Sequence, residues 1–227
     1  MQVHQPYDWE AILAWLGARA IPGVESVADG VYARGGVRVT FDGGAIRTNR
    51  ELRRVRRLFD VDTDPAPIHA TLSRDRMLAP LLRNRPGVRV PGAWDPFELA
   101  VRAIVGQQVS VAGARTILGR IAATHGLTAE ALASVTVEGM PRKRAETIRL
   151  FAREVVAGAD VREVRVPGVG PWTASYIAMR LGDRDAFPAG DLVLRRKAGN
   201  LTERELLFRA EPWRPFRAYA AMLLWSA

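Results

Sequence analysis

The sequence contains no cysteine and only three histidines, His4, His69 and His125, among its 227 residues. The lack of cysteine excludes disulfides, thiolate zinc sites and a cysteine-held iron–sulfur cluster. The histidines lie far apart and fit neither an HExxH nor an H-x3-H pattern. We therefore expect neither a histidine metal site nor a Ser-His-Asp triad.

Long apolar runs are also missing. No stretch of about 18 apolar residues occurs, so no membrane span and no membrane partner are expected. The first ten residues, MQVHQPYDWE, lack the basic and apolar regions of a signal peptide. With 48% hydrophobic and 25% charged residues, the composition is that of a globular protein with one large or two small domains. We expect a cytoplasmic protein.

Lysine is rare in a strongly basic chain. The net charge is +9, and of the 33 basic residues only Lys143 and Lys197 are lysines, which leaves 31 arginines. Arginine forks suit phosphates, although heavy arginine use can also reflect codon composition. The charge favours a polyanionic partner, with nucleic acid ahead of a membrane surface.

The N-terminal part combines helical and alternating patterns. Apolar residues at helical spacing predict a helix over 7–19, and a second, basic helix is predicted over 51–61. Between them, residues 24–48 alternate in short pieces with glycine pairs at the turns, which predicts a small antiparallel sheet. Prolines at 65 and 67 mark a boundary near residue 64. We expect a small α+β domain over 1–64 and a second domain over 65–227.

The second domain reads as helical, so the fold class is α+β with helix predominating. Its expected helix starts are Asp95-Pro96, Ser110, Pro141, Pro171, the Thr202/Glu205 capping box and a last helix after Pro212 that runs to Trp225.

The stretch VPGVGPWTASYIAMR, residues 166–180, begins with a glycine hairpin. Gly168 and Gly170 tolerate positive φ and close approach of another backbone. A turn whose amides lead into a helix N-terminus is an anion site. A P-loop is excluded because no Lys-Ser/Thr follows Gly170. A plain corner between two helices is the alternative, but in a basic chain we favour a DNA phosphate.

Asp191 is the lone acid after this helix. It can act as N-cap of a helix over 192–200, and a carboxylate beside a pocket can also stabilise positive charge or orient a water molecule. Trp172 and Tyr176 lie four residues apart on one helix face, which is typical of core but also suits a stacking pocket. Trp225 can add another wall.

Taken together, these residues resemble a known family. VPGVGPWTASYIAMR followed by FPAGD is similar to the helix–hairpin–helix and catalytic Asp signature of base-excision DNA glycosylases. Three further segments resemble the AlkA-type 3-methyladenine glycosylases: PYDWEAILAWLGARAIPGVESVADGVYAR, VPGAWDPFELAVRAIVGQQVSVAGA and GMPRKRAETI. The resemblance covers nearly the whole chain and implies a helix–hairpin–helix glycosylase core behind the small sheet domain.

The resemblance also implies roles for particular residues. Asp191 matches the catalytic aspartate. The aromatic walls of the substrate pocket match Trp15, Trp172, Tyr176 and Trp225. DNA contacts fall on Gln107, Gln108, Gly168, Gly170, Arg142, Lys143 and Arg144, with Gln108 filling the gap left by a flipped base. No cofactor is required, but the carbonyls of Val164, Val166 and Val169 match a backbone site for Na⁺ or K⁺.

The implied activity is excision of alkylated bases such as 3-methyladenine and 7-methylguanine from double-stranded DNA by a monomer that flips the base out. Trp172 stands where bifunctional relatives carry the lyase lysine, which implies a monofunctional enzyme. The chain departs from the family in Gln108, which replaces an apolar wedge, in Gly190, which replaces a second Asp, and in a shortened sheet region. A non-catalytic DNA-binding protein, a helical enzyme with a small-molecule pocket and a glycosylase for 8-oxoguanine are the alternatives.

Overall fold

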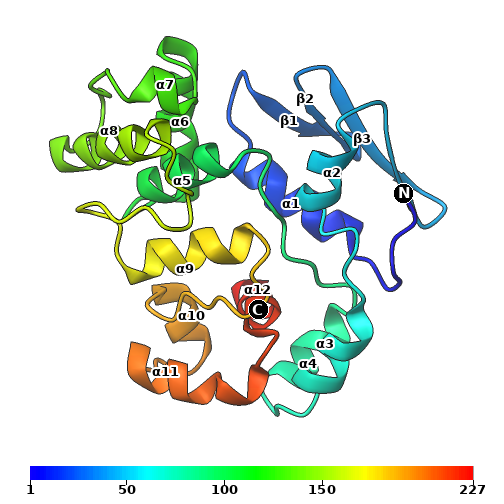
Figure 1. The fold of residues 1–227 in the computed structure, drawn as a ribbon. Helices are drawn as coiled ribbons and strands as arrows, with labels where there is room; N and C mark the ends of the chain where they lie inside the picture. The colour runs from blue at the N-terminus through cyan, green and yellow to red at the C-terminus, as the bar shows by residue number, and fades with distance from the viewer. Residues whose placement is uncertain (227) are drawn as a thin grey trace.

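The computed structural model describes residues 1–226, which form twelve α-helices, one short 3-10 helix and one four-stranded antiparallel sheet (Figure 1). The N-terminal elements are α1 (Trp9–Arg19), β1 (Glu25–Ala28), β2 (Val31–Arg34), β3 (Val37–Asp42), β4 (Ala45–Thr48) and α2 (Leu52–Leu58). They are followed by α3 (Pro65–Leu72), α4 (Leu78–Asn84), α5 (Pro96–Val105), α6 (Val111–Thr124), α7 (Ala129–Leu132) and α8 (Arg142–Val156). The last elements are α9 (Pro171–Arg180), α10 (Leu192–Lys197), α11 (Glu203–Arg209), the 3-10 turn η1 (Glu211–Trp213) and α12 (Arg217–Ser226). The expected α+β class with helix predominating is confirmed.

The sheet is a meander in which each strand pairs with its neighbour in sequence, in the order β1-β2-β3-β4. Side chains alternate between faces along β3, as strand geometry requires, so Val37 and Val39 are buried while Arg38 between them is exposed. The glycine pairs that precede and follow β3 all have positive φ, which is the backbone of tight hairpin turns. The buried face packs with α1 and α2 into one hydrophobic cluster.

The helical part is organised around two hydrophobic clusters. One joins α5, α6 and α8 with Ile177 of α9. The other joins α3 and α4 with the end of α9 and with α11 and α12. Tyr176 packs against both clusters, so α9 lies where the two meet, as Figure 1 shows. The boundary near residue 64 stays a prediction, and residues 65–226 are built around two apolar centres.

Helix starts follow the capping residues that the sequence predicts. Asp95 accepts a hydrogen bond from the amide of Glu98 at 2.9 Å, Ser110 accepts one from Gly113 at 3.1 Å, and the Thr202 capping box forms.

Several helix limits differ from the prediction. The helix predicted over 7–19 begins at Trp9, after its Asp8 cap, and the one predicted over 51–61 spans only Leu52–Leu58. The helix after Asp191 ends at Lys197 instead of residue 200, because Gly199 adopts a φ of +98° and stops it. The last helix begins at Arg217 instead of directly after Pro212, because η1 and Pro215 intervene.

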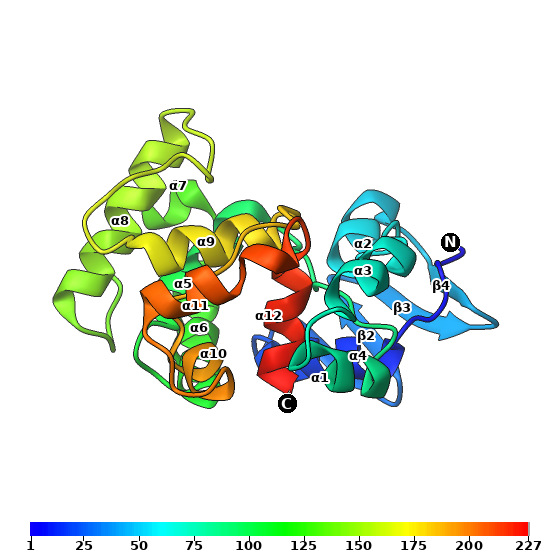
Figure 2. The ribbon, with the colours of Figure 1, turned by 90° about the horizontal axis from the view of Figure 1, so that it is seen from below.

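A buried ion network fixes the sheet to α5. Arg102 donates to Glu25 and Glu98, both at 2.7 Å, and Arg34 donates to the same two carboxylates. Tyr32 donates to Glu25 at 2.6 Å. Buried charges are costly unless they are paired and hydrogen-bonded, and here each carboxylate meets two guanidinium groups. The network holds α1, which lies against the sheet and against α6, at a fixed place beside the helical part (Figure 2).

Within residues 1–226, no helix is both long enough and apolar enough to cross a bilayer.

Candidate active site

The glycine hairpin before α9 is closed by a hydrogen bond from the amide of Val169 to the carbonyl of Val166 at 3.0 Å. Its two glycines serve different purposes. Gly168 has a φ of +91°, and a Cβ there would lie 2.2 Å from Oγ1 of Thr147, so any other residue would be strained and would have to displace Thr147. Gly170 has an ordinary φ of −87° as N-cap of α9, and a Cβ there would meet nothing within 4 Å. The backbone at Gly170 is therefore open to an external ligand.

Asp191 accepts hydrogen bonds from four donors. Its Oδ1 caps α10 by accepting the amides of Val193 at 2.9 Å and Leu194 at 3.0 Å. The indole N–H of Trp225 also donates to Oδ1, and that of Trp172 donates to Oδ2, each at 3.1 Å. The expected helix cap at Asp191 is therefore present, and its catalytic role stays a prediction. Oδ1 takes three of the four bonds, so Oδ2 keeps the spare capacity to face a substrate.

The four predicted aromatic residues are brought together from three helices. Trp172 and Tyr176 stack with their ring centroids 5.5 Å apart, as their i, i+4 spacing on α9 predicts. Trp225 of α12 meets the edge of Tyr176 at 6.2 Å, and Trp15 of α1 lies 5.6 Å from Trp225. Tyr176 and Trp225 thus link the two outer rings into one cluster.

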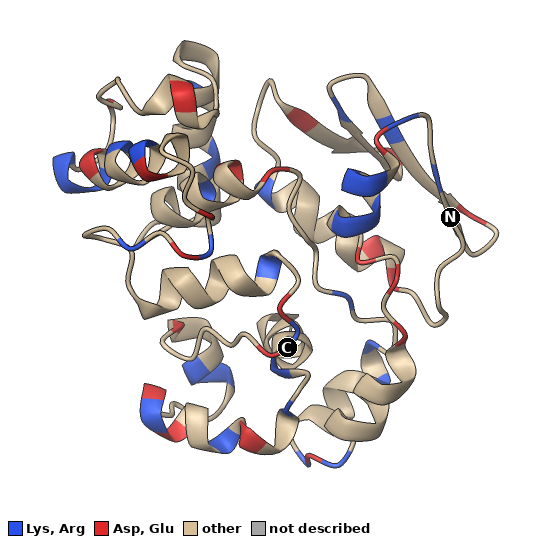
Figure 3. Ribbon diagram, in the orientation of Figure 1, with Lys and Arg blue, Asp and Glu red and all other residues tan. Residues whose placement is uncertain are grey.

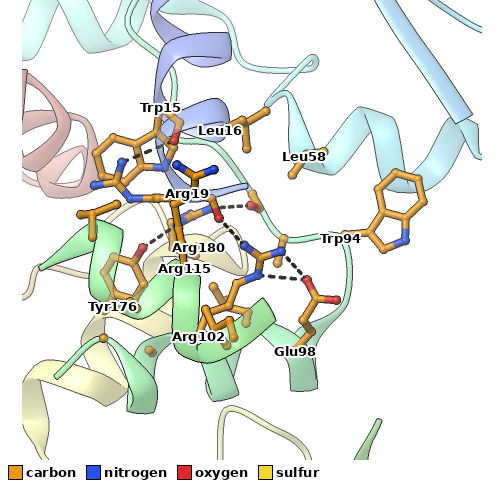
Figure 4. A pocket seen from close by; sticks show the side chains of 18 of the residues that line it. Trp15, Leu16, Arg19, Leu58, Trp94, Glu98, Arg102, Arg115, Tyr176 and Arg180 are labelled. Atoms are coloured by element: carbon orange, nitrogen blue, oxygen red, sulfur yellow. Dashed lines mark hydrogen bonds and ion pairs between the residues drawn. The ribbon is translucent and has the colours of Figure 1, made fainter. Parts of the chain in front are cut away.

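These rings and Asp191 border a cavity of about 520 Å³ between the N-terminal and helical parts. Figure 4 shows a cluster of Trp15, Arg19, Arg180 and Tyr176 in this cavity, with Arg102 and Glu98 bonded to each other to one side. Arg180 donates to the hydroxyl oxygen of Tyr176 at 2.6 Å. Burial raises the pKa of Tyr176, but Arg180 and Arg19 more than offset it, so that pKa lies below its usual value.

Sequence reasoning missed Arg19 and Arg180 as pocket residues. The signal was available, because Arg19 lies four residues after Trp15 on α1 and Arg180 four residues after Tyr176 on α9. An i, i+4 pair shares a helix face. Each arginine therefore reaches the cavity beside an aromatic residue that was identified.

The loop between α5 and α6 carries the two glutamines that were expected to contact DNA. The side-chain amide of Gln107 donates to the carbonyl of Gly168 and to Oγ1 of Thr173, each at 2.9 Å. Gln107 therefore ties this loop to the hairpin and to α9. Gln108 is exposed with a φ of +56°, a left-handed backbone that is uncommon outside glycine. Such strain is characteristic of functional loops.

The basic residues Arg142, Lys143 and Arg144 form the start of α8. That end of the helix lies against the hairpin, because Thr147 donates to the carbonyls of Lys143 and Pro167, each at 2.9 Å. Figure 3 shows that α8 carries both signs of charge, whereas α2 is mostly basic. Positive charge is therefore near the hairpin but is not confined to it.

The three carbonyls expected at a monovalent cation differ in their present partners. The carbonyl of Val164 accepts Nη1 of Arg165 at 3.1 Å, and that of Val166 accepts the hairpin amide of Val169. A carbonyl oxygen has two lone pairs, so each keeps room for one further ligand. The Arg165 guanidinium occupies one position at the Val164 carbonyl, and the cation site stays a prediction.

Comparison with known proteins gives concordant results. The model of the AlkA N-terminal domain matches residues 1–52 and 37–95. DNA-3-methyladenine glycosylase 2 of Escherichia coli is 33% identical over 270 residues, which cover 97% of this chain and 94% of that protein.

A probable bifunctional transcriptional activator/DNA repair enzyme AlkA of Mycobacterium tuberculosis is 35% identical over 278 residues, which cover 100% of this chain. The chain spans 56% of that longer relative. Among solved structures, a 3-methyladenine DNA-glycosylase from Archaeoglobus fulgidus superposes with a TM-score of 0.82 at 19% identity, over 99% of this chain and 96% of that one. That likeness shows a shared fold.

Proposed function

The chain belongs to the AlkA-type DNA-3-methyladenine glycosylase family, and from that premise we propose that it excises alkylated bases from double-stranded DNA. The observation that carries the proposal is the position of Asp191, whose carboxylate borders an aromatic cavity and accepts the indole N–H groups of Trp172 and Trp225. A helix cap alone needs neither indole. The alternative of a non-catalytic DNA-binding protein leaves this arrangement without a purpose.

A base inside a duplex is unreachable, so the damaged nucleotide leaves the stack and enters the cavity. Gln108, on an exposed loop whose Gly106 and Val109 line the cavity, fills the vacated space. The cavity volume of about 520 Å³ is within the range of small-ligand sites. The aromatic rings hold the flat base by stacking and, for a cationic base, by cation–π attraction.

Asp191 acts on the sugar. As the glycosidic bond lengthens, the sugar gains oxocarbenium character, and the carboxylate stabilises that charge or directs the attacking water. Oδ2 is the oxygen with capacity for this role, since Oδ1 already accepts three donors. An N3- or N7-alkylated purine already carries positive charge and needs no acid to leave. That fits the cavity lining, which includes none of the three histidines of residues 1–226.

The hairpin binds a phosphate of the same DNA through the amides that lead into α9. The open backbone at Gly170 and the basic start of α8 support this assignment. Na⁺ or K⁺ on the carbonyls of Val164, Val166 and Val169 would add positive charge at that phosphate. The protein acts as a monomer, and its binding should be strongly salt-dependent and weakly sequence-dependent.

Excision leaves an intact abasic strand. A lyase needs an amine for a Schiff base, and among residues 1–226 neither Lys143 nor Lys197 borders the cavity. Borohydride should trap no covalent protein–DNA adduct. A stable adduct would overturn the monofunctional assignment.

The decisive experiment is Asp191→Asn. Asparagine caps a helix as well as aspartate does, so the fold is kept while the negative charge is lost. We expect release of 3-methyladenine and 7-methylguanine from methylated DNA to fall at least about a hundredfold, with DNA binding retained. Asp42→Asn, on the exposed end of β3, is the matched control and should behave as wild type. Near-normal release by Asp191→Asn would refute the catalytic assignment, and preferred release of 8-oxoguanine by wild type would refute the alkylpurine assignment.

A further inference from the structure

The α1 end of the cavity holds a guanidinium group in the place where a cationic ligand would stack. The Cζ atom of Arg19 lies 3.3 Å from the centroid of the Trp15 ring and so covers one face of that ring. Arg180 adds a second positive charge, with its Cζ 5.8 Å from Trp15 and 5.6 Å from Tyr176. Both guanidinium groups border the cavity, as Figure 4 shows.

Neither arginine is neutralised by a carboxylate in the described residues. Arg180 donates to the carbonyls of Pro91 and Gly92 and to the hydroxyl of Tyr176. Arg19 makes a long bond, 3.4 Å, from Nη1 to the carbonyl of Trp15, and its other oxygen neighbour is the neutral hydroxyl of Tyr176. Burial lowers the pKa of Arg19, Tyr176 raises it and Arg180 lowers it further, yet arginine stays protonated at neutral pH.

Hydrogen-bond donors are in excess at this end. The indole Nε1 of Trp15 is buried and has no hydrogen-bond partner within residues 1–226. An unpaired buried donor is costly, and so is a guanidinium whose five N–H groups meet only weak, neutral acceptors. A ligand in the cavity that brings an acceptor atom would satisfy the guanidinium of Arg19. The Asp191 end is the reverse, since its carboxylate is already met by four donors.

We propose that Arg19 is a specificity-determining residue that favours a neutral purine with a carbonyl at position 6 over a cationic purine with an amino group there. The proposal rests on the proposed glycosylase function. The fork of Arg19 suits a carbonyl oxygen, whereas an exocyclic amino group offers it only another donor. A cationic base is repelled by Arg19 and Arg180, and it must compete with Arg19 for the face of Trp15.

Aromatic walls alone would select for positive charge. The resident guanidinium group opposes that selection. Cationic bases still have the lower intrinsic barrier to release. Arg19 therefore reduces the difference between their release rates and those of neutral damaged bases. The cavity thereby serves both classes of damaged purine.

Three bases separate charge from edge chemistry: hypoxanthine is neutral with a carbonyl, 7-methylguanine is cationic with a carbonyl, and 3-methyladenine is cationic with an amino group. The experiment measures single-turnover release of each by wild type, Arg19→Gln and Arg19→Lys, with hypoxanthine in a defined duplex and the methylated bases in methylated DNA. For Arg19→Gln we expect about tenfold slower release of hypoxanthine, severalfold faster release of 3-methyladenine and little change for 7-methylguanine. Arg19→Lys keeps the charge without the fork, so 3-methyladenine release should stay at the wild-type rate.

Arg38→Gln, on an exposed face of β3, removes the same charge away from the cavity and should leave all three rates unchanged. Opposite changes for hypoxanthine and 3-methyladenine support the proposal, because lost structure or weaker DNA binding would slow both. A parallel fall of all three rates, or no change, overturns it while the glycosylase function stands. If wild type releases none of the bases, the proposed function fails and the inference fails with it.

Discussion

Two groups of arginines lie at or next to the cavity, and they differ in their partners. Arg19, Arg180 and Arg102 line it, whereas Arg34 reaches it only through its ion pair with Glu98. Arg34 and Arg102 are closed by the carboxylates of Glu25 and Glu98, in a network that joins the sheet to α5. Arg19 and Arg180 meet only neutral oxygens. An arginine whose charge is matched inside the protein holds the fold together. An arginine left with weak or neutral acceptors is available to a ligand.

Two carboxylates of this cavity also differ in whether their charge is matched by arginine. Glu98 is buried between two guanidinium groups, whereas Asp191 is half-buried and bonded to indoles and amides. Replacing each carboxylate by its amide therefore tests whether Glu98 mainly stabilises the fold and Asp191 mainly supports base release.

The largest effect on stability is expected from Glu98→Gln. It leaves Arg34 and Arg102 partly unpaired in a buried site, so the free energy of unfolding should fall by about 3–5 kcal/mol. Asp191→Asn should change it by less than about 1 kcal/mol, because asparagine also caps α10. Urea unfolding at pH 7 measures both. Equal losses of unfolding free energy in the two variants would show that Glu98 and Asp191 do not differ in their structural role.

An intermediate effect, on rate instead of stability, is expected from Trp172→Phe. The change keeps a ring stacked on Tyr176 but deletes the indole N–H that orients Oδ2 of Asp191. Single-turnover release of 7-methylguanine should slow about tenfold, the value of one hydrogen bond to a charged group. Trp9→Phe, which lies against Phe41 and Phe59 in the N-terminal cluster, is the control and should keep the wild-type rate. An unchanged rate in Trp172→Phe would show that the indole bond is not needed.

The smallest effects are expected at the hairpin, where one glycine serves the fold and the other is open to a ligand. Gly168→Ala forces a side chain into a φ of +91° and against Thr147, so it should cost about 1–2 kcal/mol of stability. Gly170→Ala has room and an ordinary φ, so the fold should tolerate it while DNA affinity drops severalfold. Thermal unfolding and binding titrations at two salt concentrations measure the pair. Unaltered affinity in Gly170→Ala would move the phosphate site to Arg142, Lys143 and Arg144.

Much of the site could be predicted because its signals are local. The Thr202 capping box and the start of α9 at Pro171 depend on residues within one turn of each other. The i, i+4 spacing of Trp172 and Tyr176 likewise fixes their stacking. Asp191 preceded an apolar run, and that position alone predicts the cap that it forms.

The parts that escaped prediction depend on distant segments. Arg19 and Arg180 come from helices about 160 residues apart in sequence, and only tertiary packing makes them neighbours. The expectation that arginines serve phosphate treated them as one class. Gln107 was assigned to DNA, and its internal bonds to Gly168 and Thr173 could not be inferred from its local sequence. Its contact with DNA stays a prediction.

The position of α1 has a consequence for how this family can diversify. Trp15 and Arg19 reach the cavity from the N-terminal segment, whereas Tyr176, Asp191 and Trp225 reach it from the C-terminal third. A genetic crossover near residue 64 between two relatives would therefore exchange one wall of the pocket and keep the other. Recombination, without any point mutation beside the carboxylate, becomes a route to new lesion preferences.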